Sequence, residues 1–150
     1  MEPLIIKASI QIAKPAHDVY EAIVDPKKMS GYFIATGSGR MEEGQTLTWK
    51  FPEFSDELDV FVTQSNPDQQ VTFEWQGSPK QRTTTNITLS AGKGGGTLVK
   101  ITESEMPANE DGITWLRQNT EGWANFLACL KAYLEYNINL RKGAFDFMKA

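Results

Sequence analysis

The sequence predicts an α+β fold in which a curved antiparallel sheet of about six to seven strands wraps around one long C-terminal helix. Three observations support this prediction. Segments that alternate apolar and polar residues recur from residue 4 to residue 104, turn-forming residues separate them, and a strongly amphipathic helical period follows. The chain has 150 residues and neither a linker nor an internal repeat, so we expect a single domain over residues 1–150.

The first segment, residues 4–12, places apolar residues on one side and mostly polar residues on the other, which is typical of a half-buried strand. Pro15 fits the first turn of a helix, and the helical period continues until Asp25 and Pro26 interrupt it. A second helical turn is predicted from Pro26 to Tyr32. Two short helices are therefore expected directly after the first strand.

Five further segments have the period of strands: residues 45–51, 57–65, 70–76, 82–90 and 97–104. The run Asn66–Pro67–Asp68 is a typical turn between two of them, and the glycines of residues 92–96 provide another. Short turns between alternating segments favour antiparallel hairpins. The glycine-rich run 92–96 fits neither a phosphate-binding loop nor a dinucleotide fingerprint, so it is interpreted as a turn only.

The long helix is predicted from about Ile113 to Leu140. Its apolar residues fall on one face when residues are placed about 100° apart. They are Trp115, Leu116, Trp123, Phe126, Leu127, Leu130, Tyr133, Leu134 and Ile138. Because such a face has to be buried, and the sheet is the only partner in the chain that is long enough, we expect this helix to lie on the sheet.

Composition excludes several classes of function. Cys129 is the single cysteine and His17 the single histidine, which excludes a disulfide framework and the usual metal sites, so no metal and no cofactor are expected. A net charge of −4 without clustered Lys and Arg argues against nucleic-acid binding. No apolar run is long enough to span a membrane, and the first residues lack the form of a secretory signal, so a cytoplasmic location is expected.

The run Gly122–Glu135, GWANFLACLKAYLE, resembles the helix signature of the activator of heat-shock-protein-90 ATPase homologue family. Pro15–Val24, Asn66–Trp75 and Gly95–Thr97 resemble other parts of that family, so the resemblance extends over nearly the whole chain. In one departure, Tyr32–Phe33 stands where many relatives have a tryptophan. The resemblance implies the helix-grip (START/Bet v-like) fold of the START-like, or SRPBCC, superfamily.

Members of this superfamily often keep a cavity between the sheet and the long helix, and the aromatic residues that face this space indicate an apolar ligand site. A fully packed core is the alternative interpretation. The candidate cavity residues are Trp49, Phe73, Trp75, Glu103, Asn119, Trp123, Phe126, Leu130 and Tyr133. No residue is assigned a catalytic role, because the chain has no nucleophile elbow and no histidine near its cysteine.

Three candidate residues leave alternatives open. Asn119 lies near the centre of the apolar face and is expected to bind either a ligand carbonyl or hydroxyl, or a backbone group or water. Glu103 lies where its strand is predicted to end, so exposure near the cavity mouth is favoured over burial. Gly122 is expected to permit close packing, with cavity space as the alternative.

The leading hypothesis is a non-catalytic binding domain for an apolar or aromatic small molecule. The family resemblance implies a first alternative, a chaperone-associated module that interacts with another protein. A second alternative is a cyclase-like or hydrolase-like enzyme that uses Glu103 as a cavity acid, with Asn119 or Tyr133 positioning the substrate. The sequence is compatible with a monomer or a homodimer, and Phe145 and Phe147 in the tail are expected either to cover a cavity mouth or to join a dimer interface.

Overall fold

Seven antiparallel strands form one curved sheet in the structure, a computed structural model that describes residues 2–149. The strands are β1 (Leu4–Ile12), β2 (Thr36–Gly37), β3 (Thr46–Lys50), β4 (Glu57–Asn66), β5 (Gln70–Ser78), β6 (Gln81–Ala91) and β7 (Thr97–Met106). Their order in the sheet is β1-β7-β6-β5-β4-β3-β2, so every neighbour pair except β1 and β7 follows directly in sequence. The prediction of antiparallel hairpins is confirmed.

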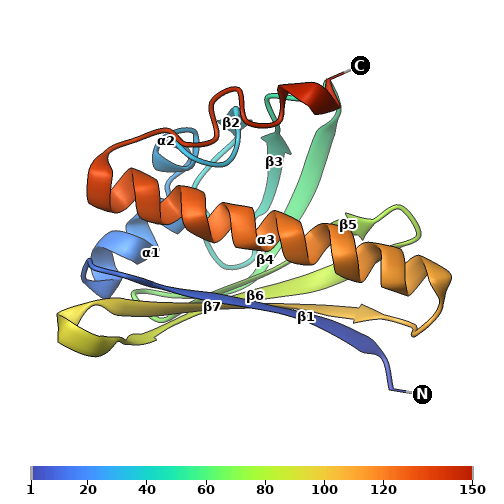
Figure 1. Cartoon of the computed structure of the whole chain (residues 1–150), viewed down its shortest axis with the longest axis horizontal. Helices are drawn as coiled ribbons and strands as arrows, with labels where there is room; N and C mark the ends of the chain where they lie inside the picture. Colours follow the sequence, from blue (N-terminus) through green and yellow to red (C-terminus); the bar gives the residue numbers. More distant parts are fainter. Residues whose placement is uncertain (1, 150) are drawn as a thin grey trace.

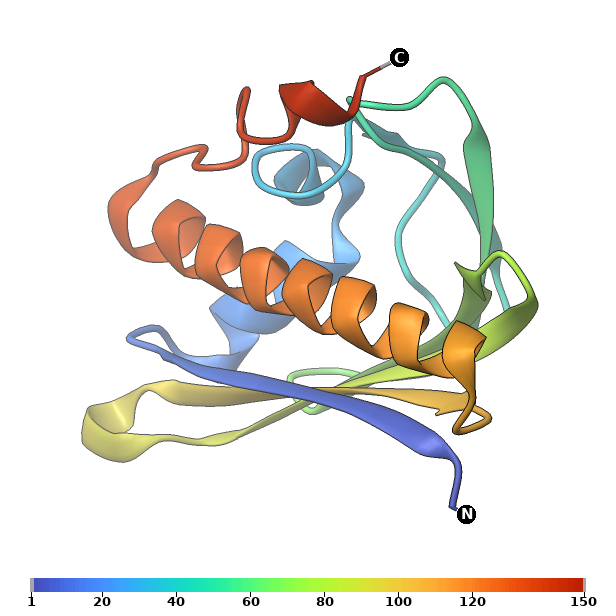
Figure 2. The ribbon, with the colours of Figure 1, turned by 45° about the vertical axis from the view of Figure 1, so that its right-hand side comes forward.

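The helices follow the predicted order. They are α1 (Ala16–Val24), α2 (Pro26–Met29) and α3 (Glu110–Tyr136), with short 3₁₀ turns η1 (Lys93–Gly95) and η2 (Asp146–Met148). Figure 1 shows α3 lying along one face of the sheet, with α1 and α2 near its C-terminal end. After α3 the chain turns back over α2 toward the β3 and β4 region, as Figure 2 also shows. This arrangement is the predicted helix-grip fold.

The structure differs from the sequence prediction at the ends of α3. The helix begins at Glu110 because the Asn109 side chain accepts a hydrogen bond from the Gly112 backbone N–H at 2.9 Å, an N-cap that the prediction overlooked. It ends at Tyr136, not at Leu140, because Asn137 adopts the left-handed conformation with φ 54°. Strand β2, only two residues long, was too short to give a sequence signal.

The core lies between α3 and the concave face of the sheet. On the helix, Trp115, Trp123, Phe126, Leu127 and Leu130 are buried, as their spacing predicts. Burial of one such side chain stabilises the fold by roughly 2–3 kcal/mol, so this helix face is a main source of stability. In the described residues, no helix combines the length and apolar character needed to cross a membrane.

Side chains fill the space under α3 unevenly. Near its C-terminal end, Tyr133 packs on Tyr32 with ring centroids 5.5 Å apart, and an added Cβ on Gly31 would lie 2.6 Å from the Tyr133 ring. Glycine is therefore required at residue 31 by close approach. Near the N-terminal half of α3 the packing is open, and this is where the structure has room for a ligand.

Candidate functional site

A cavity of about 530 Å³ lies between the N-terminal half of α3, the end of β5, the β3–β4 connection and the C-terminal segment. Aromatic side chains form much of its wall: Phe33, Phe51, Phe54, Trp75, Trp123 and Phe145. The remaining lining includes four amide side chains and two charged ones: Gln76, Gln118, Asn119, Asn125, Glu121 and Arg141. A concave, largely aromatic site with few polar groups is typical of small-molecule binding.

The nine candidate residues from the sequence separate into three groups. Trp75, Asn119 and Trp123 line this cavity. Trp49, Phe73, Phe126 and Leu130 lie in the packed core, each at most 2% exposed. Tyr133 is also packed, against the Tyr32 ring near the C-terminal end of α3. Glu103 is buried beside the cavity wall without lining it. The structure thus brings four of the nine residues, those of the first group and Glu103, to one end of the cavity.

Glu103 is completely buried, with 0% of its surface exposed, so the favoured expectation of exposure at the mouth is wrong. Strand β7 continues past it to Met106, and α3 covers it from above. Each of its carboxylate oxygens accepts a hydrogen bond from an indole: Oε2 from Trp75 Nε1 at 3.1 Å and Oε1 from Trp123 Nε1 at 2.8 Å. Both cavity-lining tryptophans are therefore held in place by one buried carboxylate.

Two further groups complete the surroundings of Glu103. Thr83 Oγ1 donates to Oε2 at 2.5 Å, and Asn119 Nδ2 donates to Oε1 at 3.1 Å. All four donor groups are neutral, so the carboxylate is stabilised by hydrogen bonds and not by an ion pair. We call Glu103, Trp75, Trp123, Thr83 and Asn119 the Glu103 cluster. Its members come from β5, β6, β7 and α3, so the cluster ties the helix to three strands.

Gly77 on β5 allows the Glu103 cluster to form. A Cβ added to this residue would lie 2.1 Å from Glu103 Oε2 and 2.1 Å from Thr83 Oγ1, which no side chain can tolerate. The Gly77 carbonyl also accepts a hydrogen bond from Asn119 Nδ2 at 2.8 Å. Glycine is required here by the close approach of two polar side chains.

Gly122 has the opposite environment. A Cβ at this residue would meet no atom within 4 Å, so the expectation that it permits close packing is wrong. Gly122 lines the cavity, which matches the alternative that the sequence left open. A glycine in the middle of a helix costs up to about 1 kcal/mol relative to alanine, and here the missing side chain leaves the cavity wider.

The C-terminal segment closes one side of the cavity with Arg141, Phe145 and Met148. Arg141 Nη2 donates to Glu53 Oε1 at 2.6 Å, and the two side chains are 16% and 3% exposed. The guanidinium lies 4.8 Å from the Phe145 ring centroid. Phe145 therefore helps to cover the cavity, one of the two roles the sequence left open for the tail, whereas Phe147 is 79% exposed.

The sequence prediction missed several residues of the cavity. Phe51 continues the apolar side of β3, and this alternation was the available signal for it. Phe33 was noted only as the aromatic residue that follows the second short helix. Arg141 and Glu53 gave no signal, because they are 88 residues apart in the chain and meet only through the returning C-terminal segment.

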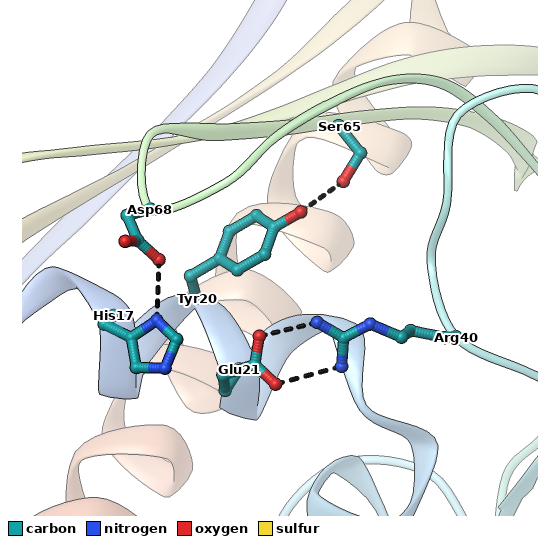
Figure 3. Close-up of polar contacts among 6 residues, drawn as sticks. All are labelled: His17, Tyr20, Glu21, Arg40, Ser65 and Asp68. Atoms are coloured by element: carbon teal, nitrogen blue, oxygen red, sulfur yellow. Dashed lines mark hydrogen bonds and ion pairs between the residues drawn. The ribbon is translucent and has the colours of Figure 1, made fainter.

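A second concave region lies at α1, with a volume of about 410 Å³ and a polar lining. Figure 3 shows its contacts: Glu21 with Arg40 and His17 Nδ1 with Asp68 Oδ1 at 3.1 Å, besides a hydrogen bond between Tyr20 and Ser65. Both nitrogens of the Arg40 fork donate to Glu21, and this hydrogen bonding lowers the pKa of the Glu21 carboxyl. His17 is 67% exposed, as expected for a surface residue.

Comparison with known families identifies the chain. Residues 13–135 match the family described as Activator of Hsp90 ATPase homolog 1-like protein. The chain belongs to this family. The resemblance noted in the sequence is thereby confirmed, and the matched range in this Activator of Hsp90 ATPase homolog 1-like protein runs from the residue after β1 to the last turn of α3.

Solved structures similar to this family member have the same fold. The protein SSP2350 from Staphylococcus saprophyticus is 30% identical, covers 92% of this chain and 96% of its own, and superposes with a TM-score of 0.81. The Aha1 dimer from Colwellia psychrerythraea is 24% identical, with coverage of 89% and 97% and a TM-score of 0.75.

DynU16, a protein of the dynemicin biosynthetic locus, is 23% identical with a TM-score of 0.78, over 89% of this chain and 48% of DynU16. At the 24% and 23% identity of the Colwellia Aha1 dimer and DynU16, the similarity to this chain concerns the fold. A comparison with curated protein sequences gives no match.

Proposed function

We propose that this member of the Activator of Hsp90 ATPase homolog 1-like family is a non-catalytic domain that binds an apolar or aromatic small molecule in the cavity beside α3. The observation that supports this most directly is the pair of indoles, Trp75 and Trp123, which line the cavity and are both anchored to Glu103. Rings held in place before binding lose little conformational entropy when a flat apolar ligand packs against them.

The hydrogen bonding of Glu103 argues against its use as a cavity acid. A carboxylate has about four lone-pair positions, and four donor groups already occupy them. To exchange a proton with a substrate, Glu103 would have to release at least one indole or the Asn119 amide. Its position supports a role in holding the wall of the cavity and not in chemistry.

Binding is tested with N-phenyl-1-naphthylamine, an uncharged apolar dye whose fluorescence rises in an apolar site. We expect saturable binding to the protein at micromolar concentration. The variant Gly122→Phe places a ring in the open space of the cavity and is expected to weaken binding at least about tenfold. Ala128→Phe is the matched control, because Ala128 is exposed on the same helix and lies outside the cavity lining.

Two outcomes would contradict the proposal. One is the lack of saturable dye binding by the unmodified chain, and the other is equal binding by the Gly122→Phe and Ala128→Phe variants. Native mass spectrometry of the protein purified from its own host complements the dye experiment, because a retained molecule would reveal the chemical class of the natural ligand.

A chaperone-associated role is a second candidate. It is favoured by the family to which the chain belongs and by its similarity to the Aha1 dimer from Colwellia psychrerythraea. The test is the ATPase rate of the heat-shock-protein-90 chaperone from the same host, measured with and without the purified chain. A rise in the rate that persists in Gly122→Phe would favour this role over cavity binding, and an unchanged rate would exclude it.

A further inference from the structure

We infer that the cavity selects an uncharged aromatic ligand that carries a hydroxyl group, and that Asn119 Oδ1 accepts the hydrogen bond from this hydroxyl. The inference rests on the proposed binding function and adds the chemical class of the ligand. At the Glu103 end of the cavity the hydrogen-bond donors of the Glu103 cluster already have partners, whereas the acceptor Asn119 Oδ1 has none among the described residues.

The donors at this end of the cavity are already used. The N–H groups of Trp75 and Trp123 and the hydroxyl of Thr83 donate to Glu103. The Asn119 amide nitrogen has two hydrogens, and it donates to Glu103 Oε1 at 3.1 Å and to the Gly77 carbonyl at 2.8 Å. A ligand carbonyl or carboxylate that reached this end would therefore find no free donor in the Glu103 cluster.

The same contacts determine the orientation of the Asn119 amide. Both of its neighbours on the nitrogen side are acceptors, so rotating the amide by 180° would place oxygen against oxygen and lose both hydrogen bonds. Asn119 Oδ1 therefore points away from them. It has no hydrogen-bond partner among the described residues, and its side chain lines the cavity. A free acceptor on an aromatic wall favours a ligand that donates a hydrogen bond.

The side chain of Gln76, another lining residue, is oriented in the same way, with its amide nitrogen bonded to the protein. Its Nε2 donates to the Ser78 carbonyl at 2.7 Å, which also directs the amide nitrogen toward the backbone. Gln118 and Asn125 line the cavity as well, but neither makes a side-chain hydrogen bond within the described residues, so their amides offer either atom. Asn119 is thus the lining amide whose acceptor is presented by a rigid arrangement.

Charge disfavours an acidic ligand. Glu103, directly behind the cavity wall, has no cation among its hydrogen-bond partners, and Glu121 places a carboxylate in the lining itself. Arg141 is the only cation among the described lining residues, and Glu53 already balances its charge. An anion in this cavity would lose its hydration without gaining an unpaired cation. Arg141 Nε, which is buried without a partner, is the competing point of recognition, since it would favour a ligand with an acceptor.

The test uses three naphthalenes of similar size that displace N-phenyl-1-naphthylamine at pH 7. They are 2-naphthol, which donates a hydrogen bond, 2-methoxynaphthalene, which only accepts one, and 2-naphthoate, which is an anion. We expect 2-naphthol to bind at least about tenfold more tightly than either of the others, because it alone forms a hydrogen bond with an acceptor that a bound ring removes from water.

Variants connect the preference to Asn119. Asn119→Leu removes the acceptor at similar volume and is expected to reduce the preference for 2-naphthol over 2-methoxynaphthalene to about twofold or less. Gln64→Leu, at an exposed position on β4 outside the cavity lining, is the control and is expected to leave the preference unchanged. The comparison of the three probes on the unmodified chain does not depend on how well Asn119→Leu folds.

The outcomes distinguish this inference from the proposed function. If the dye binds but 2-methoxynaphthalene equals 2-naphthol, or no naphthalene displaces the dye, the inference is overturned and the binding function remains. If 2-naphthoate binds most tightly, Arg141 selects the ligand and the inference is again overturned. If the dye itself does not bind, the proposed function fails, and the inference fails with it.

Discussion

Glu103 and Glu21 both accept hydrogen bonds on both carboxylate oxygens, yet their surroundings are opposite. Glu103 is 0% exposed and surrounded by neutral donors, whereas Glu21 is 24% exposed at its side chain and paired with Arg40. Water and salt screen the pair at Glu21, so its energetic contribution is small. The buried Glu103 carboxylate has no such screening. If it were removed, each group that donates a hydrogen bond to it would lose its acceptor. The Glu103 cluster therefore determines the structure at the cavity, while the Glu21–Arg40 pair at α1 contributes little to stability.

The largest effect is expected from Glu103→Ala. The change leaves the N–H of the buried Trp123 indole, the N–H of the partly buried Trp75 indole and the Thr83 hydroxyl without their acceptor, at about 1–3 kcal/mol each. We therefore expect a loss of more than about 3 kcal/mol in the free energy of unfolding. Urea unfolding followed by tryptophan fluorescence measures it. Asp59→Ala, at an exposed position on β4, is the control and should change stability by less than about 0.5 kcal/mol. A loss below about 1 kcal/mol for Glu103→Ala would remove the contrast with Glu21.

A pair of glycine variants separates close approach from open space. Gly77→Ala drives a methyl group into Glu103 and Thr83, and we expect it to cost about 2 kcal/mol or more. Gly122→Ala meets no neighbour and gains helix propensity, so a stabilisation of up to about 1 kcal/mol is expected. Thermal unfolding of both variants checks the two signs. Equal losses in both would show that the Glu103 cluster tolerates displacement.

Glu53 is intermediate, because it is buried like Glu103 but paired with a cation like Glu21. Arg141→Gln would leave the Glu53 carboxylate, 3% exposed, without its guanidinium partner. We expect the free energy of unfolding to fall by about 1–2 kcal/mol. Faster release of the dye should accompany it, since Arg141 also holds Phe145 near the cavity. Stopped-flow displacement measures the release rate. An unchanged rate would mean that the C-terminal segment does not control access.

The smallest effect is expected from Glu21→Gln. Its pKa is lowered by the hydrogen bonds from Arg40, so the folded state binds fewer protons than the unfolded state near that pKa. The stabilisation is therefore complete above the unfolded pKa of about 4.3 and disappears as the pH falls through the lower folded value. We expect about 0.5 kcal/mol at pH 7 in low salt, and none at about pH 3. Urea unfolding of the unmodified chain and of Glu21→Gln at the two pH values measures the stability difference. A difference that is larger at about pH 3 than at pH 7 would contradict the expected pH dependence.

The sequence by itself determined the fold. The alternating segments have the period of strands and the segment from about residue 113 has the period of a helix, and these periods depend only on local residue order. The apolar face of that segment then requires burial against the sheet. The same pattern places Trp75, Asn119 and Trp123 on the inner surface, and these three residues line the cavity.

Only the tertiary structure decided which inner-facing residues surround open space and which are packed. Trp49 and Trp123 have the same chemistry and nearly equal burial, but only Trp123 lines the cavity. Local pattern cannot separate them, since a void depends on how elements distant in sequence approach one another. The burial of Glu103 and the pairing of Arg141 with Glu53 have the same origin. They arise from contacts between elements up to 88 residues apart, whose geometry the folded sheet and helix together create.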